Sequence, residues 1–244
     1  MYNRIQRCKN VYLLLTLFAT PLLYAADKPL SLVTAAQPPL GSTSTYTGIL
    51  EKISKEAFHR IGIDIRVTIL PGERALINVN SGIDDGDMFR APGFESNYPN
   101  LIKVPEKIGI MEFMAYSKEP HSDAMSWQVL QKHSVAYATG WKIYDRKVKN
   151  SEITKVRSIH NLFPLLENGR ADIILIDRWQ GLYIAKQSDH KVHLIEPPLA
   201  TVDMYMYLHK SHEALIPALS AALKEMKRDG SYNRIFESIK DSLK

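Results

Sequence analysis

Polar and aromatic side chains gather in three groups of loops along the chain. These groups are Gln37-Pro38-Pro39 with Tyr46, then Asp87-Met88-Phe89-Arg90, and finally Thr139-Gly140-Trp141-Lys142 with Asp177-Arg178-Trp179. An arginine can bind a carboxylate through two hydrogen bonds, an aspartate can accept hydrogen bonds from an ammonium group, and an aromatic ring can cover the body of a ligand. Together these residue types suit a zwitterion or another small polar ligand with an apolar part.

The position of the third group favours this interpretation. Both of its segments come directly after a predicted strand, and open α/β sheets bind ligands at the carboxyl ends of their strands. Taken singly, each residue also has a structural interpretation. Arg90 and Asp177 would then be partners in surface salt bridges, and Trp141 and Trp179 would be core aromatics.

Other chemistries have weaker sequence support. The pairs His190/His193 and His209/His212 have a spacing that metal sites use, but neither lies near cysteines or paired acids. Asp84-Asp85-Gly86-Asp87 lacks the spaced ligands and closing glutamate of a calcium loop, which favours a turn leading into a strand. The chain has no phosphate-binding glycine loop and no G-x-S-x-G motif. We therefore expect no metal, no cofactor and no catalytic residue.

The first 25 residues have the features of a secretion signal. Arg4, Arg7 and Lys9 precede an apolar run from Val11 to Leu23, and Ala25 is a small residue at the expected cleavage point. The run is shorter than the roughly 20 apolar residues of a membrane-spanning helix. We expect removal of this segment and a periplasmic protein, with an uncleaved anchor as the alternative.

Composition and charge limit the function of what remains. The 244 residues are 45% hydrophobic and 23% charged, a globular balance whose length suits one large domain or two lobes. From Asp27 onward the chain has 28 Lys or Arg and 26 Asp or Glu, a net charge of +2, which gives no case for nucleic-acid binding. The only cysteine, Cys8, lies in the expected signal, so the mature chain would have no disulfide.

Strand-like and helix-like segments alternate along the mature chain. Short β-rich or alternating apolar runs predict strands at 30–34, 63–70, 111–116, 135–138, 171–176 and 204–208. Apolar residues at helical spacing predict helices at 49–61, 73–79, 158–168, 211–229 and 231–239. This alternation is typical of a parallel sheet covered by helices.

Several segments, in order along the chain, resemble one protein family. They are Tyr46-Thr47-Gly48 before a helix, Glu73-Arg74-Ala75-Leu76 through Asn80-Ser81-Gly82-Ile83-Asp84-Asp85, Leu165 to Asp172 with Asp177, and Lys227-Arg228-Asp229-Gly230-Ser231-Tyr232-Asn233-Arg234-Ile235. Over nearly all of the mature chain, their order and spacing resemble the family 3 extracellular solute-binding proteins, the amino-acid-binding branch of the type II periplasmic binding proteins. The resemblance implies an α/β fold of two lobes joined by two crossing hinge strands, with the ligand cleft between the lobes.

The resemblance also implies site residues. Asp177 falls where the family's aspartate binds a ligand α-ammonium group, and Gly140 falls where a Gly-Thr pair meets the α-carboxylate, although Trp141 replaces the threonine. The position of the family's carboxylate-binding arginine holds no arginine here, which leaves Arg90 as the nearest guanidinium. The expected ligand-binding residues are Tyr46, Arg74, Arg90, Gly140, Trp141, Asp177 and Trp179.

Arg90 and Asp177 are expected to be the two charged poles of the site, one in each lobe. Arg90 follows a strand that should end at the cleft, where its guanidinium can bind a carboxylate. In the alternative interpretation, Arg90 pairs with Asp87 or Glu95 at the rim and does not touch the ligand.

The family-like layout sets the expected boundaries and function. We expect a signal peptide at 1–25, lobe 1 at 26–115, lobe 2 with the hinge strands at 116–208, and C-terminal helices that return to lobe 1 at 209–244. The hinge would lie near Ala115-Tyr116-Ser117 and Tyr205-Met206-Tyr207. The protein would capture an amino acid or a related compound by closing its lobes and present it to a membrane importer.

Three other functions stay open from the sequence. The protein could sense a ligand for a membrane signalling receptor. It could instead be a dehydratase-type enzyme on the same scaffold, with Glu73, Glu95 or Glu196 as a general acid if burial raises its pKa. An exported scaffold that binds only proteins would expose an apolar patch and lack a closable cleft. We expect a monomeric binding protein that is not an enzyme.

Overall fold

The computed structural model describes residues 28–120, 124–149 and 152–243, apart from the side chains of 239–242. The expected signal peptide at 1–25 lies outside these ranges. Within them, no helix has both the length and the apolar character needed to cross a bilayer.

Strands and helices alternate along most of the chain, as the sequence predicts. The strands are β1 (Leu30–Thr34), β2 (Ile65–Ile69), β3 (Gly86–Arg90), β4 (Leu101–Lys103), β5 (Gly109–Ser117), β6 (Val135–Ala138), β7 (Ile153–Val156), β8 (Ile173–Asp177) and β9 (His193–His209). The helices are α1 (Ile49–His59), α2 (Gly72–Asn80), α3 (Trp127–Leu130), α4 (Lys142–Lys147), α5 (Leu162–Glu167), α6 (Arg178–Gln187), α7 (Ile216–Arg228) and α8 (Ser231–Leu243), with 3-10 turns at Ile159–Asn161 and Lys210–Leu215.

The strands pair in the order β2-β1-β3-β9-β5-β8-β6-β7, with β4 beside β9. β1 is parallel to β2 and β3, and β6 is parallel to β7 and β8. The long strand β9 is antiparallel to β3 and β4 near its end and to β5 along the rest. The expected mixed α/β architecture is therefore confirmed, and β9 is common to both halves of the sheet.

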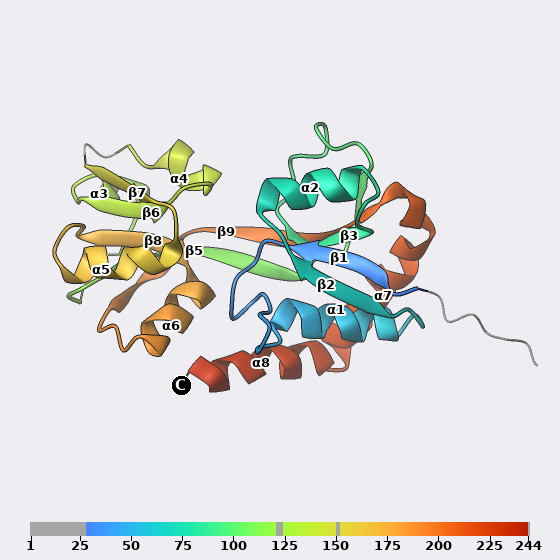
Figure 1. Ribbon diagram of the computed structural model, residues 1–244. Coiled ribbons are helices and arrows are strands. Elements are labelled where there is room, and N and C mark those ends of the chain that lie inside the picture. The colour runs from blue at the N-terminus through green and yellow to red at the C-terminus, as the bar shows by residue number, and fades with distance from the viewer. Residues whose placement is uncertain (1–27, 121–123, 150–151, 244) are drawn as a thin grey trace, which may run out of the picture.

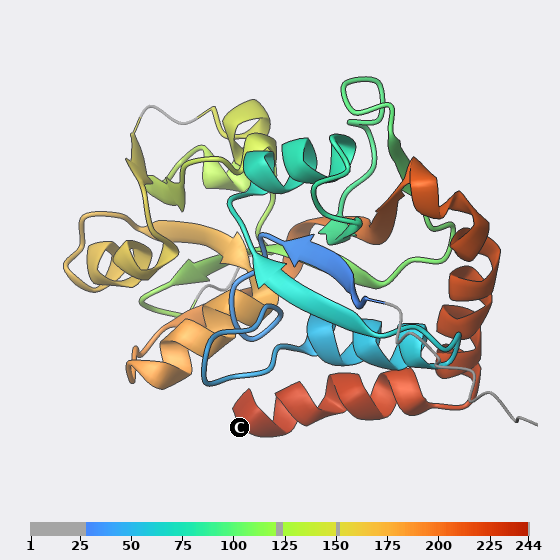
Figure 2. The ribbon, with the colours of Figure 1, turned by 45° about the vertical axis from the view of Figure 1, so that its right-hand side comes forward.

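Each half of the sheet lies within one of two lobes (Figure 1). Lobe 1 here means β1–β4 and the end of β9 with α1, α2, α7 and α8, and lobe 2 means β6–β8 with α3–α6. The last two helices return to pack against α1 (Figures 1 and 2). The residue boundaries of the lobes stay predictions.

A short two-stranded ribbon joins the lobes. β5 pairs with β9 from Gly109 onward and with β8 from Phe113 onward, while β9 pairs with β3 from Tyr205 onward. Residues 109–112 beside 201–204 therefore connect the two half-sheets. The expected hinge residues lie just beyond this ribbon, because Ala115-Tyr116-Ser117 pair within lobe 2 and Tyr205 and Tyr207 pair within lobe 1.

Helix α1 shows how the sequence produces an element of lobe 1. Ile53, Ala57 and Phe58 recur at helical spacing, and all are buried on one face. That face joins the same core as Leu223 of α7. Burying a large apolar side chain contributes about 1.5–3 kcal/mol, so this contact fixes α7 on lobe 1. Gly62, with φ +75°, adopts the left-handed conformation just after the helix.

The sheet of lobe 2 carries helices on both faces, and this layering positions Asp177. Leu175 shares a core with Tyr144 of α4, whereas Ile174 shares the opposite core with Ile184 of α6. Side chains alternate between the two faces of a strand, so Asp177 lies on the same side as Leu175. The strand therefore directs the Asp177 side chain toward the layer of α4.

Candidate ligand-binding site

Asp177 ends β8 and caps α6. Its Oδ1 accepts hydrogen bonds from the backbone N–H groups of Trp179 at 3.0 Å and Gln180 at 3.1 Å. These are orphan donors of the first helical turn, which an aspartate at the N-cap typically satisfies. The other oxygen, Oδ2, is buried and has no hydrogen-bond partner within the described ranges. One oxygen thus has a structural role, and the other is left for a further partner.

The environment of Asp177 disfavours its charge. Burial raises the pKa of this carboxyl to about 7, and the two backbone hydrogen bonds oppose the rise only in part. The residue is 1% exposed, and no salt bridge joins it to another described residue. A buried carboxylate becomes favourable when a cation or a hydrogen-bond donor reaches it. A ligand ammonium group would supply both.

Aromatic residues line the α4 side of this site. Tyr144 is fully buried, and its hydroxyl also has no partner among the residues described. Its ring stacks on Trp141 with centroids 5.5 Å apart and meets Phe113 edge-on at 5.6 Å. Phe113 is the strand partner of Asp177 and also contacts the rings of Trp141 and Tyr144, so it joins them to the aspartate. Burial, and after it the charge of Asp177, raises the pKa of Tyr144.

The sequence prediction omits Tyr144, although a signal for it exists. Trp141, Tyr144 and Val148 are spaced three and four residues apart, which is the pattern of a helix with one buried face. The short helix α4 was not among the predicted elements. Recognising it would have placed the Tyr144 ring in the core beside Trp141.

Gly140 forms the turn between β6 and α4. Its φ is +93°, a conformation that strains residues with a side chain, and its carbonyl accepts a hydrogen bond from the Lys142 N–H at 3.1 Å. A Cβ at this position would meet open space. The glycine is therefore required by backbone conformation rather than by crowding, and it turns the chain so that Trp141 follows at the head of α4.

Arg90 ends β3 in lobe 1 and has internal partners. Its Nε donates to Asp87 Oδ2 at 2.6 Å, and its Nη2 donates to the Gly72 carbonyl at 2.8 Å. This is the salt bridge that the alternative interpretation of the sequence expects. The side chain is 17% exposed, so a ligand contact by Arg90 stays a prediction. Arg74, two residues after Gly72, is exposed in the first turn of α2.

The other two predicted aromatic residues lie between the lobes, against or on α6. The ring of Tyr46, from lobe 1, is 6.1 Å from Tyr183 of α6. Trp179, in the first turn of α6, meets Phe236 of α8 edge-on at 5.2 Å. These pairs connect α6 to lobe 1, so in this structure Tyr46 and Trp179 are interlobe contacts.

Arg178 follows Asp177 but is bound to two carboxylates. Its Nε donates to Glu112 at 2.7 Å, and its Nη1 donates to Glu196 at 2.6 Å. Glu112 lies on the ribbon and Glu196 on β9, so the arginine ties the start of α6 to both connecting strands. The guanidinium is thereby occupied, which disfavours Arg178 as a partner of a ligand carboxylate.

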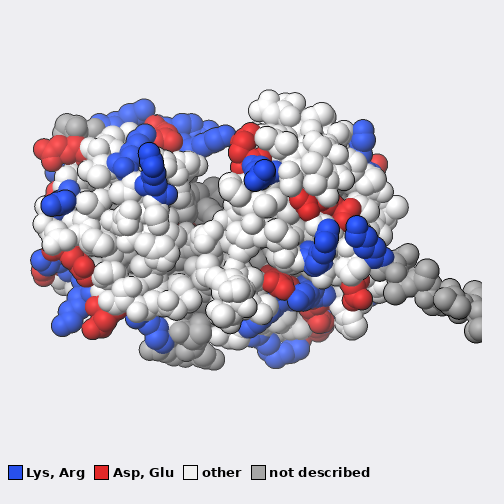
Figure 3. Space-filling model, viewed as in Figure 1, with Lys and Arg blue, Asp and Glu red and all other residues white. Residues whose placement is uncertain are grey.

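The structure thus brings two of the predicted site residues together and leaves both predicted arginines elsewhere. Trp141 and Asp177 come together with Tyr144 in lobe 2, whereas Arg90 and Arg74 lie in lobe 1. No described contact joins Arg90 to Asp177. Figure 3 shows the surface hollowed between the lobes, beside α4 on one side and α2 on the other. A ligand contact shared by the two sets of residues stays a prediction.

Comparison with known sequences finds a relative at low identity and no family model. No protein-family model matches the chain. An uncharacterized protein of Shewanella oneidensis is 26% identical over 201 residues, which cover 79% of this chain and 76% of the relative.

Solved structures are similar at low sequence identity. The GluR0 ligand-binding core in complex with L-glutamate has a TM-score of 0.76 and 10% identity, covering 87% of this chain and 98% of that chain. The substrate-binding protein of an amino acid ABC transporter has a TM-score of 0.67 and 15% identity, with 86% and 98% covered. A histidine kinase sensor domain with similarity to periplasmic binding proteins has a TM-score of 0.69 and 13% identity, with 87% and 96% covered. This chain has the two-lobed periplasmic-binding-protein fold.

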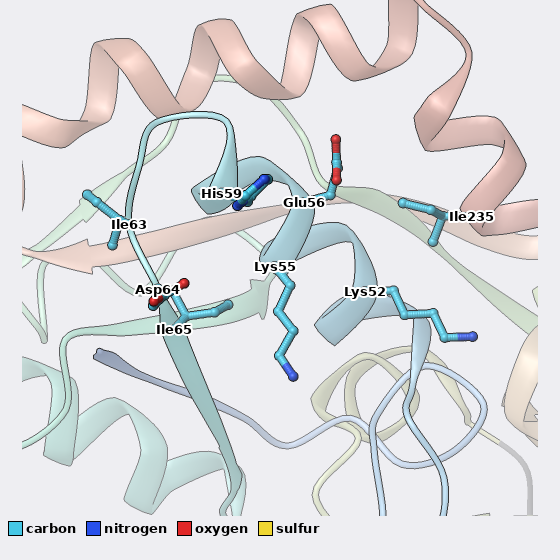
Figure 4. A pocket seen from close by; sticks show the side chains of 8 residues that line it. All are labelled: Lys52, Lys55, Glu56, His59, Ile63, Asp64, Ile65 and Ile235. Atoms are coloured by element: carbon cyan, nitrogen blue, oxygen red, sulfur yellow. The ribbon is translucent and has the colours of Figure 1, made fainter. Parts of the chain in front are cut away.

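A surface cavity of about 420 Å³ lies away from the cleft that this fold implies. It is lined by Lys52, Lys55, Glu56 and His59 of α1, by Ile63-Asp64-Ile65 at the start of β2, and by Ile235 of α8. Figure 4 shows Lys55 and Glu56 extending in opposite directions. Lys55 pairs with Glu51, and Glu56 pairs with Arg60. These side chains do not converge on one point, so the cavity is not the candidate site.

The histidine pairs considered as metal ligands have other neighbours in the structure. Over the described ranges, no group of three or more His, Cys, Asp or Glu side chains is arranged to hold a metal ion. His212 of the His209/His212 pair instead lies 2.7 Å from Asp85, and His190 of the His190/His193 pair lies 2.6 Å from Glu167. These histidines have carboxylate neighbours that give them a structural role.

Proposed function

We propose that this protein is an exported solute-binding protein that captures a small ligand with an amino group, such as an amino acid or a related compound. The observation that carries the proposal is the buried Asp177 carboxyl, which has one oxygen on the N-terminus of α6 and one oxygen without a partner in the described chain. An ammonium group that reached Oδ2 would form a charge-assisted hydrogen bond and stabilise the carboxylate. The Tyr144 hydroxyl and the Trp141 ring would then contact the rest of the ligand.

Lobe closure gives this binding a mechanism. Asp177, Trp141 and Gly140 belong to lobe 2, whereas Arg90 and Arg74 belong to lobe 1, and a ligand that touches both sets favours the closed arrangement by its difference in affinity. We propose that a membrane importer recognises the closed form. A signalling receptor is the second candidate partner, because both a transporter component and a kinase sensor domain share the fold.

The contacts of the candidate general acids give the dehydratase alternative little support. The hydrogen bond from Tyr207 lowers the pKa of Glu95, and the Arg178 guanidinium lowers the pKa of Glu196. A general acid at neutral pH needs a raised pKa, so neither carboxyl is suited to the step. Glu73 is exposed and accepts a hydrogen bond from Tyr98.

The proposal is tested by a ligand screen followed by one substitution. Thermal-shift measurements with amino acids, small peptides, polyamines and organic acids should identify a stabilising compound, and isothermal titration should give its affinity. Asp177→Asn keeps an oxygen to cap α6, because Asn caps helices about as well as Asp, but it removes the charge. Losing a buried charged contact typically costs about 2–5 kcal/mol, or roughly 30- to several-thousand-fold in affinity.

A matched control is Asp189→Asn, the same chemical change at an exposed position after α6. Asn tolerates the positive φ of Asp189, so this variant should fold and bind ligand normally. Wild-type affinity in Asp177→Asn would contradict the ammonium site. Failure of every amino-containing compound in the screen would contradict the proposed ligand class.

A further inference from the structure

Positive charge is concentrated in one short part of lobe 2. Residues 132–157 contain seven Lys or Arg and two Asp or Glu, a net charge of +5. The preceding stretch, 83–131, contains four Lys or Arg and eight Asp or Glu. Because residues 27–244 together carry only +2, the rest of the chain has a net negative charge. The asymmetry is large enough to attract an anionic surface to one side of the molecule.

The cations of this region are exposed and mostly unpaired. Lys155 pairs with Asp145 at 2.5 Å. The others are exposed, and none forms a salt bridge with a residue that the structure describes. We call these six residues the basic patch: Lys132, Lys142, Arg146, Lys147, Lys149 and Arg157. No fold-stabilising ion pair accounts for their charge, which leaves them available to a partner.

The basic patch lies on the α4 side of lobe 2. Lys142, Arg146 and Lys147 belong to α4, which begins directly after Gly140 and Trp141 of the candidate site. Figure 3 shows Lys and Arg side chains along the edge of lobe 2 that α4 forms, reaching the hollow between the lobes. A partner bound to the patch would therefore lie beside the entrance to the cleft.

We propose that the basic patch attaches the protein to a bilayer surface that contains anionic phospholipids. Protein interfaces have cores enriched in aromatic and apolar residues and depleted in lysine, whereas the patch has four lysines and two arginines. The apolar side chains of α4 face inward, with Tyr144 buried and Ile143 half-buried. Phosphate headgroups need no apolar core, since each Lys or Arg near an anionic bilayer adds about fivefold to the affinity.

This attachment goes beyond ligand capture and does not depend on it. A protein held by α4 would diffuse in the plane of the membrane with its cleft entrance close to the bilayer. An importer or receptor embedded in the same membrane would then meet it by a two-dimensional search. The contact is electrostatic and exposed, so added salt should weaken it.

Vesicle cosedimentation tests the proposal. The full chain is recovered as the cell processes it, so that any N-terminal apolar segment is the same in every variant. We expect the wild-type protein to bind vesicles that contain phosphatidylglycerol and not vesicles of phosphatidylcholine alone. The triple variant K142E/R146E/K147E should bind the anionic vesicles about a hundredfold less tightly, or weaker still.

The matched control K52E/R66E/K224E makes the same change in charge at exposed positions of lobe 1 and should keep most of the binding. Equal melting temperatures should show that both variants fold. Equal loss of binding in the two variants, or equal binding to both kinds of vesicle, would overturn the proposal. Failure of the wild type to bind anionic vesicles would also overturn it, as expected if the patch meets an acidic protein surface instead.

Discussion

Each lobe buries an aspartate on a strand of its sheet, and the two aspartates are neutralised differently. In lobe 1, Asp87 is 0% exposed, pairs with Arg90 at 2.6 Å, and accepts a hydrogen bond from the Phe89 N–H at 3.2 Å. In lobe 2, Asp177 is 1% exposed and receives two backbone N–H groups of α6, with no salt bridge to a described residue. Burial raises the pKa of both carboxyls.

The two buried carboxyl groups, Asp87 and Asp177, therefore differ in how far their partners satisfy them. The charge of Asp87 is satisfied within lobe 1, so this aspartate and Arg90 hold β3 and the start of α2 together before any ligand arrives. Asp177 is satisfied only in part, which leaves lobe 2 with a position that a cationic ligand group would complete. Lobe 1 thus provides a cation for its buried aspartate, whereas in lobe 2 one oxygen of Asp177 has no partner within the described chain.

The largest expected loss of stability follows from removing Arg90, the partner of Asp87. Arg90→Ala leaves the charge of Asp87 buried without a cation, although the Phe89 N–H remains, and this typically costs about 3–5 kcal/mol of unfolding free energy. Urea denaturation would measure this loss. The double variant Asp87→Asn/Arg90→Ala should recover much of the stability, because the uncompensated charge is gone.

The same pair of variants separates stability from ligand binding. If Arg90 is a pole of the site, affinity falls in both the single and the double variant. If Arg90 only neutralises Asp87, the stable double variant binds ligand as the wild type does. A fully stable Arg90→Ala protein would contradict the comparison of the two lobes.

The second expected effect is a change in unfolding free energy with pH, of up to about 4 kcal/mol, caused by the ionisation of Asp177. The pKa of Asp177 is about 7 in the folded protein against 3.8 for an ordinary aspartate, so between these values the folded state holds a proton that the unfolded state has released. Stability then falls as pH rises through this range. Asp177→Asn cannot ionise, so it should be more stable than the wild type at pH 8 and nearly equal to it at pH 4. Thermal unfolding at both pH values checks this, and a difference independent of pH would show that Asp177 is not protonated as inferred.

The smallest effect, about 1 kcal/mol, concerns the Tyr144 hydroxyl. Because this group is buried without a partner in the described chain, Tyr144→Phe should leave the ligand-free protein as stable or slightly more stable. If the hydroxyl bonds to ligand, titration should show an affinity about fivefold weaker. In the control Tyr137→Phe, a hydrogen bond to Asp145 of 3.1 Å is lost, so stability should fall with affinity unchanged. Reduced stability and unchanged affinity in Tyr144→Phe would assign its hydroxyl a structural role.

The sequence predicts the elements well where one local pattern dominates. The apolar run at 135–138 is β6 with the same bounds, whereas the prediction of 204–208 finds only the last part of β9. The reason lies in Pro197 and Pro198, which cannot donate to a strand ladder and so disfavour a strand. Both prolines lie where the pairing of β9 with β5 is irregular, between the pairs Phe113–Ala200 and Ala115–Ile195. Long-range pairing with β5 overrides the local signal.

Some residues of the candidate site are predictable from local sequence, and others are not. Asp177 is predictable because a fully apolar run ends in a polar residue at the carboxyl end of a strand. The partners of Arg178 are not predictable, since Glu112 and Glu196 are 66 and 18 residues away in sequence and only the folded strands bring them together. The contact of Trp179 is likewise not predictable, because its ring meets Phe236 of α8, which is 57 residues later in the sequence. Local sequence marks the strand ends, while tertiary packing decides which side chains there remain available.

The ribbon between the lobes has a mechanical consequence. Two antiparallel strands bonded to each other can twist and bend about a common axis, whereas sliding one past the other would break their hydrogen bonds. If the lobes move relative to each other, we therefore expect a rotation about an axis through 109–112 and 201–204. Asp177 pairs with Phe113, the first residue beyond this ribbon. The Asp177 carboxyl group accordingly lies close to this expected axis, where a rotation that leaves its hydrogen bonds intact would still displace the far end of lobe 2 by a much larger distance.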